Sequence, residues 1–321
     1  MTTIDVVLPV HNGERTIARA IRSVLTQDHP HWRLIIVDDG SSDGTPAILE
    51  EFRCDPRITV VRQDNAGVAS ARNAGLRAAE GDYVQFLDCD DELVPTALSA
   101  IAAAVDSGIR PDVVYFRFVE HPRSERGGRL PDATDRHAVL ASILDEDGVG
   151  GYIGNRAFST DFLRREQLLF DPELRFMEDS DFAVRVGLAS HRDAILDRRL
   201  YEYHRSGGVT STPFSAARID GMLSLERSAK ALTPRFPDLA ARCRSLRVHL
   251  AVSLLLHGRA QGRMTGAQEA HLRAVLRDAD LSAVAPRRVR FSAWLSRAMP
   301  GVAYRVWSVA RAARAIHVRA S

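Results

Sequence analysis

Short apolar runs alternate with helical patterns over the first 120 residues. The runs are rich in valine, isoleucine and aromatic residues, as buried strands are, and they cover Ile4–Val10, Leu34–Val37, Ile58–Val61, Tyr83–Leu87 and Val113–Phe118. The segments between them repeat their apolar residues with a helical period and predict helices at Thr16–Leu25, Pro46–Phe52, Ala66–Ala79 and Pro95–Val105. This repetition predicts an α/β fold in which helices cover a mostly parallel sheet.

The pattern changes further along the chain. Short helices are expected at Arg136–Leu144 and Phe182–Ala189, and from Phe214 to Pro286 the pattern is helical with few turn residues. We therefore expect an α/β domain over residues 1–213 and a helical extension over residues 214–321.

Composition narrows the class of protein. With 321 residues, 45% of them hydrophobic and 26% charged, the chain is neither disordered nor collagen-like, and it is long enough for a sizeable core. Three cysteines without a CxxC spacing fit a reducing compartment. Because the strand pattern begins at Ile4 and no apolar run reaches about 18 residues, we expect neither a signal peptide nor a spanning helix. A cytoplasmic protein is expected.

The net charge of +2 hides two different regions. Residues 1–280 hold 35 basic and 41 acidic residues, whereas no acidic residue follows Asp280. Eight arginines do follow it, at positions 287, 288, 290, 297, 305, 311, 314 and 319, interleaved with aromatic and aliphatic residues. Such a segment suits peripheral binding to anionic lipids on the inner face of the cell membrane. The alternative is a helical cap whose aromatic residues pack inward; specific nucleic-acid binding is not expected.

Polar clusters follow three of the predicted strands. They are His11-Asn12-Gly13-Glu14, Asp38-Asp39-Gly40-Ser41 and Asp88-Cys89-Asp90-Asp91. In open α/β sheets, ligands bind in the crevice at the carboxyl ends of the strands. We therefore expect the three clusters to converge on one crevice.

The cluster at residues 88–91 has two interpretations. Three carboxylates in four residues repel one another unless a cation lies among them, and oxygen ligands suit Mg²⁺ or Mn²⁺. The alternative is that these acidic residues favour the dipole of the following helix.

Asp39 and Arg72 also have two interpretations each. The Asp38–Asp39 pair could accept hydrogen bonds from a nucleobase or ribose, or it could belong to an ordinary turn. Arg72 follows the start of a predicted helix, where it could reach a phosphate or base from the crevice, or the segment could be only a tightly packed helix.

Taken together and in order, these motifs are far more specific than any one alone. They are Leu8-Pro9-Val10-His11-Asn12-Gly13-Glu14, Ile36-Val37-Asp38-Asp39-Gly40-Ser41, Asn65-Ala66-Gly67 through Arg72-Asn73-Ala74-Gly75, and Phe86-Leu87-Asp88-Cys89-Asp90-Asp91. The series closely resembles the family 2 glycosyltransferases of the GT-A fold, over residues 4 to about 205. His11 stands where this family usually has a tyrosine.

The resemblance implies a nucleotide-diphosphate sugar as donor, a divalent cation and inversion at the anomeric carbon. It places four residues around the nucleoside, namely Pro9, His11, Asn12 and Glu14. It also implies that Asp39 binds the base and Arg72 braces the nucleotide. Asp88 and Asp90 match the family's Asp-x-Asp motif, with Asp88 nearer the ribose and Asp90 on the metal.

The chemistry requires a second carboxylate. A divalent cation stabilises the negative charge that develops on the departing diphosphate, so a general acid is not needed, but the attacking hydroxyl must lose a proton to a base. Glu178-Asp179 matches the family's Glu-Asp motif, which makes Asp179 the predicted base and Glu178 an acceptor-side residue. The alternative is that both acids stabilise the start of the following helix.

Two further segments carry weaker matches. Tyr201-Glu202-Tyr203-His204-Arg205-Ser206 resembles the segment that closes over the donor phosphates in this family, with His204 as third metal ligand and Arg205 on the diphosphate; a solvated His–Arg pair is the alternative. Asn155-Arg156 matches a position near the acceptor.

We thus expect an inverting, metal-dependent glycosyltransferase that moves a sugar to a hydroxyl acceptor in glycan, polysaccharide or glycolipid assembly. One alternative is an inactive, glycosyltransferase-like binding module, which predicts loss of carboxylates that are all present here. Another is a sugar nucleotidyltransferase, which needs a glycine-rich basic loop after the first strand, where this chain has His11-Asn12-Gly13-Glu14-Arg15.

Overall fold

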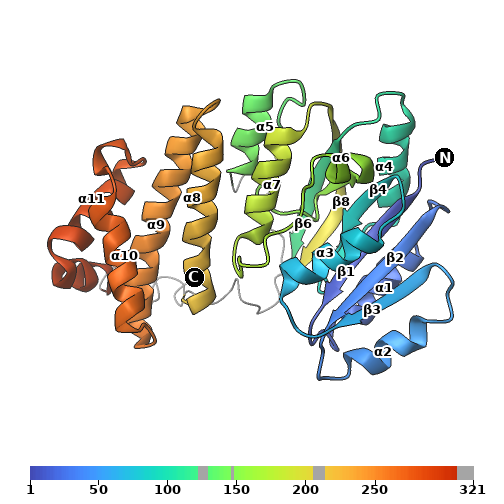
Figure 1. Ribbon diagram of the computed structural model, residues 1–321, viewed down its shortest axis with the longest axis horizontal. Helices are drawn as coiled ribbons and strands as arrows, with labels where there is room; N and C mark the ends of the chain where they lie inside the picture. The colour runs from blue at the N-terminus through green and yellow to red at the C-terminus, as the bar shows by residue number, and fades with distance from the viewer. Residues whose placement is uncertain (122–128, 146–147, 205–213, 309–321) are drawn as a thin grey trace, which may run out of the picture. The chain divides into compact units, whose positions relative to one another are not determined.

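The computed structural model describes residues 1–121, 129–145, 148–204 and 214–308 (Figure 1). The chain forms two compact units, Met1–Ser206 and Gly207–Ser321. The predicted domain boundary after residue 213 adjoins residues 205–213, which lie outside the described residues, as does Arg205.

The first unit is built on an eight-stranded sheet of order β3-β2-β1-β4-β7-β6-β8-β5. Its strands are β1 (Ile4–Val10), β2 (Trp32–Asp39), β3 (Ile58–Gln63), β4 (Tyr83–Phe86), β5 (Glu92–Leu93), β6 (Val113–His121), β7 (Arg156–Ser159) and β8 (Asp193–His204). The helices of this unit are α1 (Ile17–Leu25), α2 (Thr45–Phe52), α3 (Val68–Ala78), α4 (Ala97–Asp106), α5 (Arg136–Ile143), α6 (Thr160–Arg165) and α7 (Glu178–Ala189).

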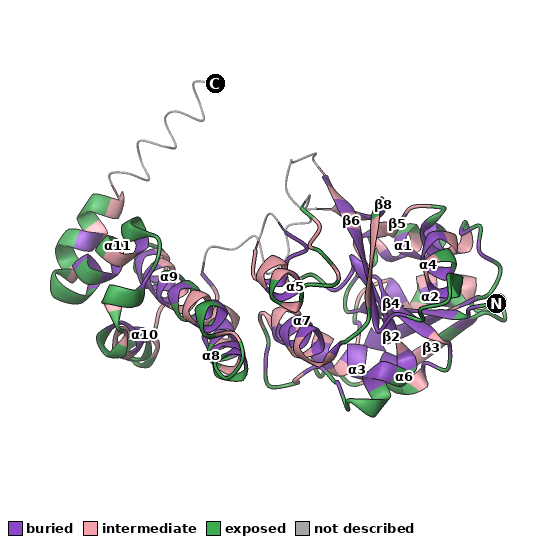
Figure 2. Ribbon diagram, turned by 90° about the horizontal axis from the view of Figure 1, so that it is seen from above, coloured by how far each residue is buried: buried purple, intermediate pink, exposed green. Residues whose placement is uncertain are grey.

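The sheet is mixed. The pairs β1–β2, β2–β3, β1–β4 and β6–β8 are parallel, whereas β4–β7, β6–β7 and β5–β8 are antiparallel. The predicted α/β class is confirmed, and the antiparallel pairs involve strands that no apolar run had marked. Figure 2 shows the strands buried between layers of partly exposed helices.

Helix packing follows the apolar spacing. Ile17, Ala20, Ile21 and Val24 lie at helical spacing on α1 and are all buried. On α3, a Cβ added to Gly75 would lie 2.3 Å from Val7 Cγ1, so only glycine lets this helix approach β1 so closely. This close approach places Arg72, one turn earlier on α3, beside the ends of the central strands.

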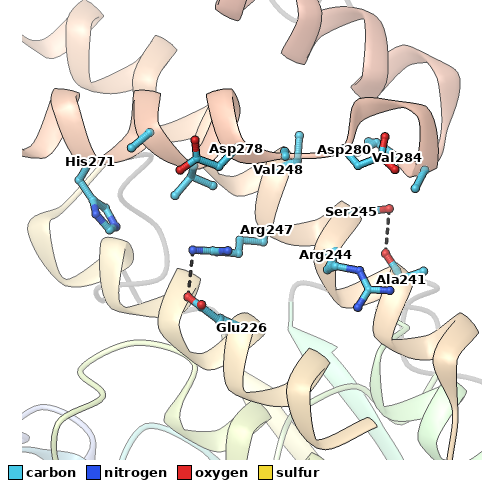
Figure 3. A pocket seen from close by; sticks show the side chains of 14 residues that line it. Glu226, Ala241, Arg244, Ser245, Arg247, Val248, His271, Asp278, Asp280 and Val284 are labelled. Carbon is cyan, nitrogen blue, oxygen red and sulfur yellow. Dashed lines mark hydrogen bonds and ion pairs between the residues drawn. The ribbon is translucent and has the colours of Figure 1, made fainter. Parts of the chain in front are cut away.

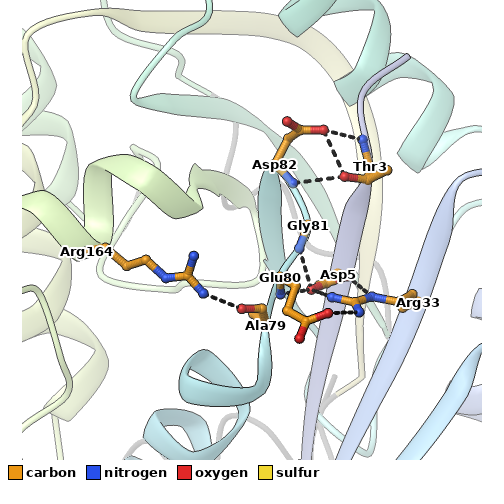
Figure 4. A network of polar contacts seen from close by, with 8 residues as sticks. All are labelled: Thr3, Asp5, Arg33, Ala79, Glu80, Gly81, Asp82 and Arg164. Atoms are coloured by element: carbon orange, nitrogen blue, oxygen red, sulfur yellow. Dashed lines mark hydrogen bonds and ion pairs between the residues drawn. The ribbon is translucent and has the colours of Figure 1, made fainter.

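Buried Asp5 fastens the opposite, amino-terminal end of these strands (Figure 4). Its carboxylate accepts hydrogen bonds from Arg33 Nε at 2.9 Å and Nη2 at 2.6 Å, and from the backbone N–H groups of Glu80 at 2.7 Å and Gly81 at 2.8 Å. One side chain therefore joins β1, β2 and the turn that enters β4.

The second unit is helical, as expected. It contains η2 (Ala216–Ile219), α8 (Asp220–Leu232), α9 (Pro237–Gln261), α10 (Gly266–Asp278), η3 (Leu281–Ala283) and α11 (Arg287–Ala298). Its core gathers buried apolar residues from α8, α9, α10 and α11, among them Met222, Leu255, Leu272 and Ala293. Among the described helices, none combines the length and apolar character needed to cross a bilayer. All three cysteines are free thiols.

Candidate active site

The polar residues after β1 and β2 hold each other in place. Asn12, whose φ of 54° lies in the left-handed region that asparagine tolerates, accepts a hydrogen bond from Ser42 N at 2.9 Å through its side-chain oxygen. Glu14 Oε2 accepts from Gly44 N at 2.9 Å, and the His11 Nδ1 lies 2.9 Å from Asp39 O. The two loops therefore form one rigid wall at the carboxyl ends of β1 and β2.

Two residues of the predicted nucleoside pocket are buried. Asp39 is only 3% exposed, and its carboxylate accepts from the backbone N–H groups of Ala66 and Gly67, each at 2.9 Å, and from Gln63 Nε2 at 2.7 Å. Asp39 thus shapes the turn that enters α3. Pro9 lies on β1 after Val7, the last residue of β1 that pairs with β4. Because proline has no backbone N–H, this position is tolerated, since no hydrogen bond to β4 is lost.

Arg72 is the centre of the site. It is 5% exposed and donates from Nη1 to Glu178 Oε1 at 2.7 Å and from Nη2 to Asp88 Oδ1 at 2.9 Å. One guanidinium on α3 therefore brings the end of β4 to the start of α7, a sequence separation of 106 residues between Arg72 and Glu178. The geometry resembles a two-sided clamp, since the planar guanidinium directs its donors along fixed lines.

Asp179 follows Glu178 at the start of α7, where Met177 has a left-handed φ of 61°. Such a conformation in a non-glycine residue is costly and is common at functional sites. Burial and the neighbouring Glu178 carboxylate raise the pKa of Asp179 to about 7, against the opposing charge of Arg72. A carboxylate with a pKa near neutrality is suited to accept a proton at physiological pH.

A small pocket joins Asp179 to the carboxylates after β4. Asp88, Asp91 and Asp179 line it together with Asn155, Tyr201 and an aromatic group formed by Phe118, Tyr152 and Tyr203. The ring of Tyr152 lies 5.5 Å from Phe118 and 5.7 Å from Tyr203, centroid to centroid. Sequence patterns gave none of these aromatic residues a role in this pocket, although Tyr201 and Tyr203 belong to the segment that was matched to the donor phosphates.

Asp91 faces inward rather than toward solvent. It is 1% exposed and accepts hydrogen bonds from Tyr201 Oη at 2.6 Å and from the backbone N–H of His204 at 2.8 Å. Burial and the Asp88 charge raise the pKa of Asp91 to about 8. Asp91 therefore ties residues 88–91, called the carboxylate loop below, to β8.

The carboxylate loop fits a divalent cation. The side chain of Asp88 is 38% exposed and only its Oδ1 is bound by Arg72, while burial first and the nearby Asp88 charge second raise the pKa of Asp91. Oxygen donors in such a setting suit Mg²⁺ or Mn²⁺, and Asp88 and Asp90 are the residues that would hold it.

His204 has close neighbours of its own. Its Nε2 lies 2.9 Å from Glu92 Oε1, and its ring stacks on that of His121 at 4.8 Å. The potential ligand atoms of His121, Glu202 and His204 all lie within 4.8 Å of one another. In the part of the chain that the structure describes, no other three His, Cys, Asp or Glu side chains come this close together. The assignment of His204 to a metal shared with Asp88 and Asp90 stays a prediction.

Asn155 and Arg156, the predicted acceptor-side pair, have different positions relative to the pocket. Asn155 lines the pocket and donates to Val149 O at 2.8 Å. Arg156 is fully buried and donates from Nη2 to Gly150 O at 2.6 Å, and burial lowers its pKa. Arg156 therefore supports the loop under Tyr152 and does not line the pocket.

A second pocket, of about 670 Å³, lies in the helical unit (Figure 3). Arg247 pairs with Glu226 there at 2.9 Å, and the lining combines charged side chains with small apolar residues. None of the site residues predicted from the sequence lines it. The candidate active site therefore lies in the first unit.

Comparisons with known proteins identify similar glycosyltransferases and polysaccharide biosynthesis proteins. "Uncharacterized glycosyltransferase EpsJ" of Bacillus subtilis (strain 168) is 29% identical over 251 residues, which cover 75% of this chain and 72% of EpsJ. "Succinoglycan biosynthesis protein ExoO" of Rhizobium meliloti (strain 1021) is 30% identical over 70% of this chain and 67% of its own.

Solved structures share the fold. S. aureus TarS 1–349 in complex with UDP-GlcNAc has a TM-score of 0.69 at 22% identity, covering 94% of this chain and 89% of that one. The mannosyltransferase PcManGT from Pyrobaculum calidifontis, in complex with GDP-Man and Mn²⁺, has a TM-score of 0.56 at 18% identity, covering 93% and 88%. The sequence model described as "Glycosyl transferase family 2" matches residues 5–183, the span that carries the Arg72 cluster, and the chain is a member of this glycosyltransferase family.

Proposed function

We propose that the protein is an inverting, metal-dependent glycosyltransferase that transfers a sugar from a nucleotide-diphosphate sugar to a hydroxyl group of a growing glycan, polysaccharide or glycolipid. The observation that carries this proposal is the clamp of Arg72 on Asp88 and Glu178, which sets Asp179 beside the carboxylate loop. The cytoplasmic location expected from the sequence belongs to the proposal.

The nucleotide would lie along the wall formed by residues 11–14 and 39–44. In this arrangement Asp39 faces the base and Asp88 the ribose, with the diphosphate directed toward Asp90. A divalent cation bound there would stabilise the charge of the departing diphosphate as a Lewis acid. A nucleotide-sugar donor is supported by two proteins of similar fold, since TarS was solved with UDP-GlcNAc and PcManGT with GDP-Man and Mn²⁺.

Asp179 would act as the base. The acceptor oxygen attacks the anomeric carbon as the bond from that carbon to the diphosphate oxygen breaks, and the hydroxyl proton passes to the Asp179 carboxylate. Because base and leaving group then lie on opposite sides of the sugar ring, the configuration inverts. Glu178, held by Arg72, would orient the acceptor side.

Donor turnover tests the proposal. The protein is incubated with UDP- and GDP-sugars and Mn²⁺, and release of the nucleoside diphosphate is measured with and without EDTA. We expect release from at least one donor, a loss of at least about tenfold with EDTA, and recovery with excess Mn²⁺. Binding of a donor without release would favour the inactive module, and activity insensitive to EDTA would contradict metal dependence.

The pKa of Asp179 predicts the pH profile. The base accepts a proton only when ionised, so kcat/KM should rise with pH and level off above about 7. The measurement is kcat/KM across the range from about pH 5 to 9, with circular dichroism at each pH as a control for unfolding. A rate that stays constant down to about pH 5, where an ordinary carboxyl group begins to protonate, would contradict the assignment.

Tyr152 is expected to contact the acceptor, because it is 43% exposed, belongs to the aromatic group and lines the pocket with Asp179. Tyr152→Ala should raise the acceptor KM about fivefold to tenfold and leave the donor KM unchanged, since a ring contact contributes about 1 kcal/mol. Tyr152→Phe should retain the wild-type KM. Leu169→Ala, at another exposed apolar side chain of the same unit, is the matched control; an equal effect there would refute a specific role for Tyr152.

A further inference from the structure

The end of the helical unit exposes an unusual number of large apolar side chains. Phe291, Trp294, Met299, Val302 and Val306 are between 43% and 61% exposed. They account for five of the eleven exposed large hydrophobic residues in the described parts of the chain, within only 16 positions. Scattered single exposed residues need no explanation, but their concentration in one short segment indicates an interaction surface.

Helix α11 has two different apolar faces. Val289 and Ala293 belong to the core of the helical unit, and Leu295 and Ser296 of the same helix are also buried. At 3.6 residues per turn, Phe291, Trp294 and Ala298 lie on the opposite side of the helix, and all three are exposed. The rings of Phe291 and Trp294 stack with a centroid distance of 6.1 Å. The outward face of α11 is therefore distinct from the face that packs into the core.

Arginines flank this outward face. Arg287, Arg288, Arg297 and Arg305 are exposed, and none of them has a carboxylate partner among the described residues. No acidic residue follows Asp280 in the sequence, so the segment is positive throughout. Exposed aromatic and aliphatic side chains surrounded by unpaired arginines match the chemistry of an anionic bilayer, in which rings enter the headgroup region and guanidinium groups meet phosphates.

We propose that the exposed apolar side chains of residues 291–306, which are Phe291 and Trp294 on the outward face of α11 and Met299, Val302 and Val306 beyond its end, bind together with the flanking arginines to the surface of a bilayer that contains anionic lipids. This inference does not depend on the proposed transfer reaction. Two signals act together, since apolar burial anchors the helix and charge recruits it.

Vesicle co-sedimentation of the full-length chain tests this proposal. We expect binding to vesicles of phosphatidylcholine with phosphatidylglycerol, weaker binding to phosphatidylcholine alone, and release at high salt. The tryptophan emission should shift to shorter wavelength on binding, because Trp294 and Trp307 lie in this segment, whereas Trp32, which is buried in the first unit, should not respond. Each arginine near the surface should change the partition coefficient by about fivefold, which Arg287→Gln/Arg288→Gln would measure.

Phe291→Ser/Trp294→Ser should reduce binding at least about tenfold. The matched control is Leu223→Ser/Leu246→Ser, which removes two other exposed apolar side chains of the same unit and should bind as the wild type does. Three results would overturn the proposal: no binding to anionic vesicles, equal loss in both double variants, or lipid-free self-association that only the first variant abolishes. Binding to RNA in preference to anionic vesicles would also overturn it. Donor hydrolysis by the Phe291→Ser/Trp294→Ser variant should stay unchanged in the absence of lipid.

Discussion

Asp179→Asn is expected to lower kcat by two to four orders of magnitude, the usual contribution of a positioned general base. Asparagine keeps the size of the side chain but cannot accept the acceptor proton. The donor lies on the Asp39 and Asp88 side of the clamp in this proposal, so its dissociation constant should change by no more than about threefold. Transfer assays quenched at successive time points measure kcat, and calorimetric titration measures the dissociation constant of the donor.

Asp161→Asn is the matched control for this substitution. Asp161 is also an acidic residue in the first turn of a helix, α6, but it is exposed and does not line the pocket. If Asp179 served only the helix dipole, both variants would lose a similar, small amount of stability and little turnover. Turnover of Asp179→Asn within about fivefold of the wild type would refute the base assignment.

The central strands could be predicted because they are buried on both faces. The runs at Ile4–Val10 and Val113–Phe118 correspond to β1 and most of β6, since a strand covered on both sides has to be apolar throughout. β7 and β8 could not be found in this way. β7 has four residues and includes the buried Arg156, and β8 contains the exposed pair Arg198 and Arg199.

The candidate site was also predictable only in part. Asp88, Arg72 and Asp179 could be identified as polar residues in local motifs, and the structure places them together. The contacts that connect them could not be predicted, because the one between Arg72 and Glu178 spans 106 residues and depends on how α3 and α7 pack. The aromatic group likewise depends on the parallel pairing of β6 and β8, which brings the ring of Phe118 to 6.3 Å from that of Tyr203, centroid to centroid.

The sequence pattern could also not predict whether the polar side chains of the loops bind a ligand or support the loop structure. Asn12 and Glu14 carry the predicted nucleoside contacts, yet in the structure their side chains accept hydrogen bonds from the β2–α2 loop. A polar residue next to a binding crevice can bind the ligand, support the wall, or do both, and composition does not separate these roles. Only the hydrogen-bond partners do.

Asp5→Ala is expected to lower the free energy of unfolding by about 3–4 kcal/mol, the largest stability effect that we predict for a single side chain of the sheet. The substitution removes an acceptor of four hydrogen bonds and leaves the buried N–H of Gly81 without its partner. Urea denaturation followed by circular dichroism measures the change. Transfer activity of the folded fraction should persist, because Asp5 lies at the amino-terminal end of β1 and the site at its carboxyl end.

Arg33→Ala separates the buried acceptor from its ion pair. The Arg33 side chain is 41% exposed, and without it Asp5 still accepts from two backbone N–H groups, so a loss of only about 1–2 kcal/mol is expected. High salt should narrow the difference between wild type and Arg33→Ala more than that between wild type and Asp5→Ala, since backbone hydrogen bonds are not screened. If Arg33→Ala were as destabilising as Asp5→Ala, the ion pair rather than the carboxylate's contacts with the turn would hold the three strands together.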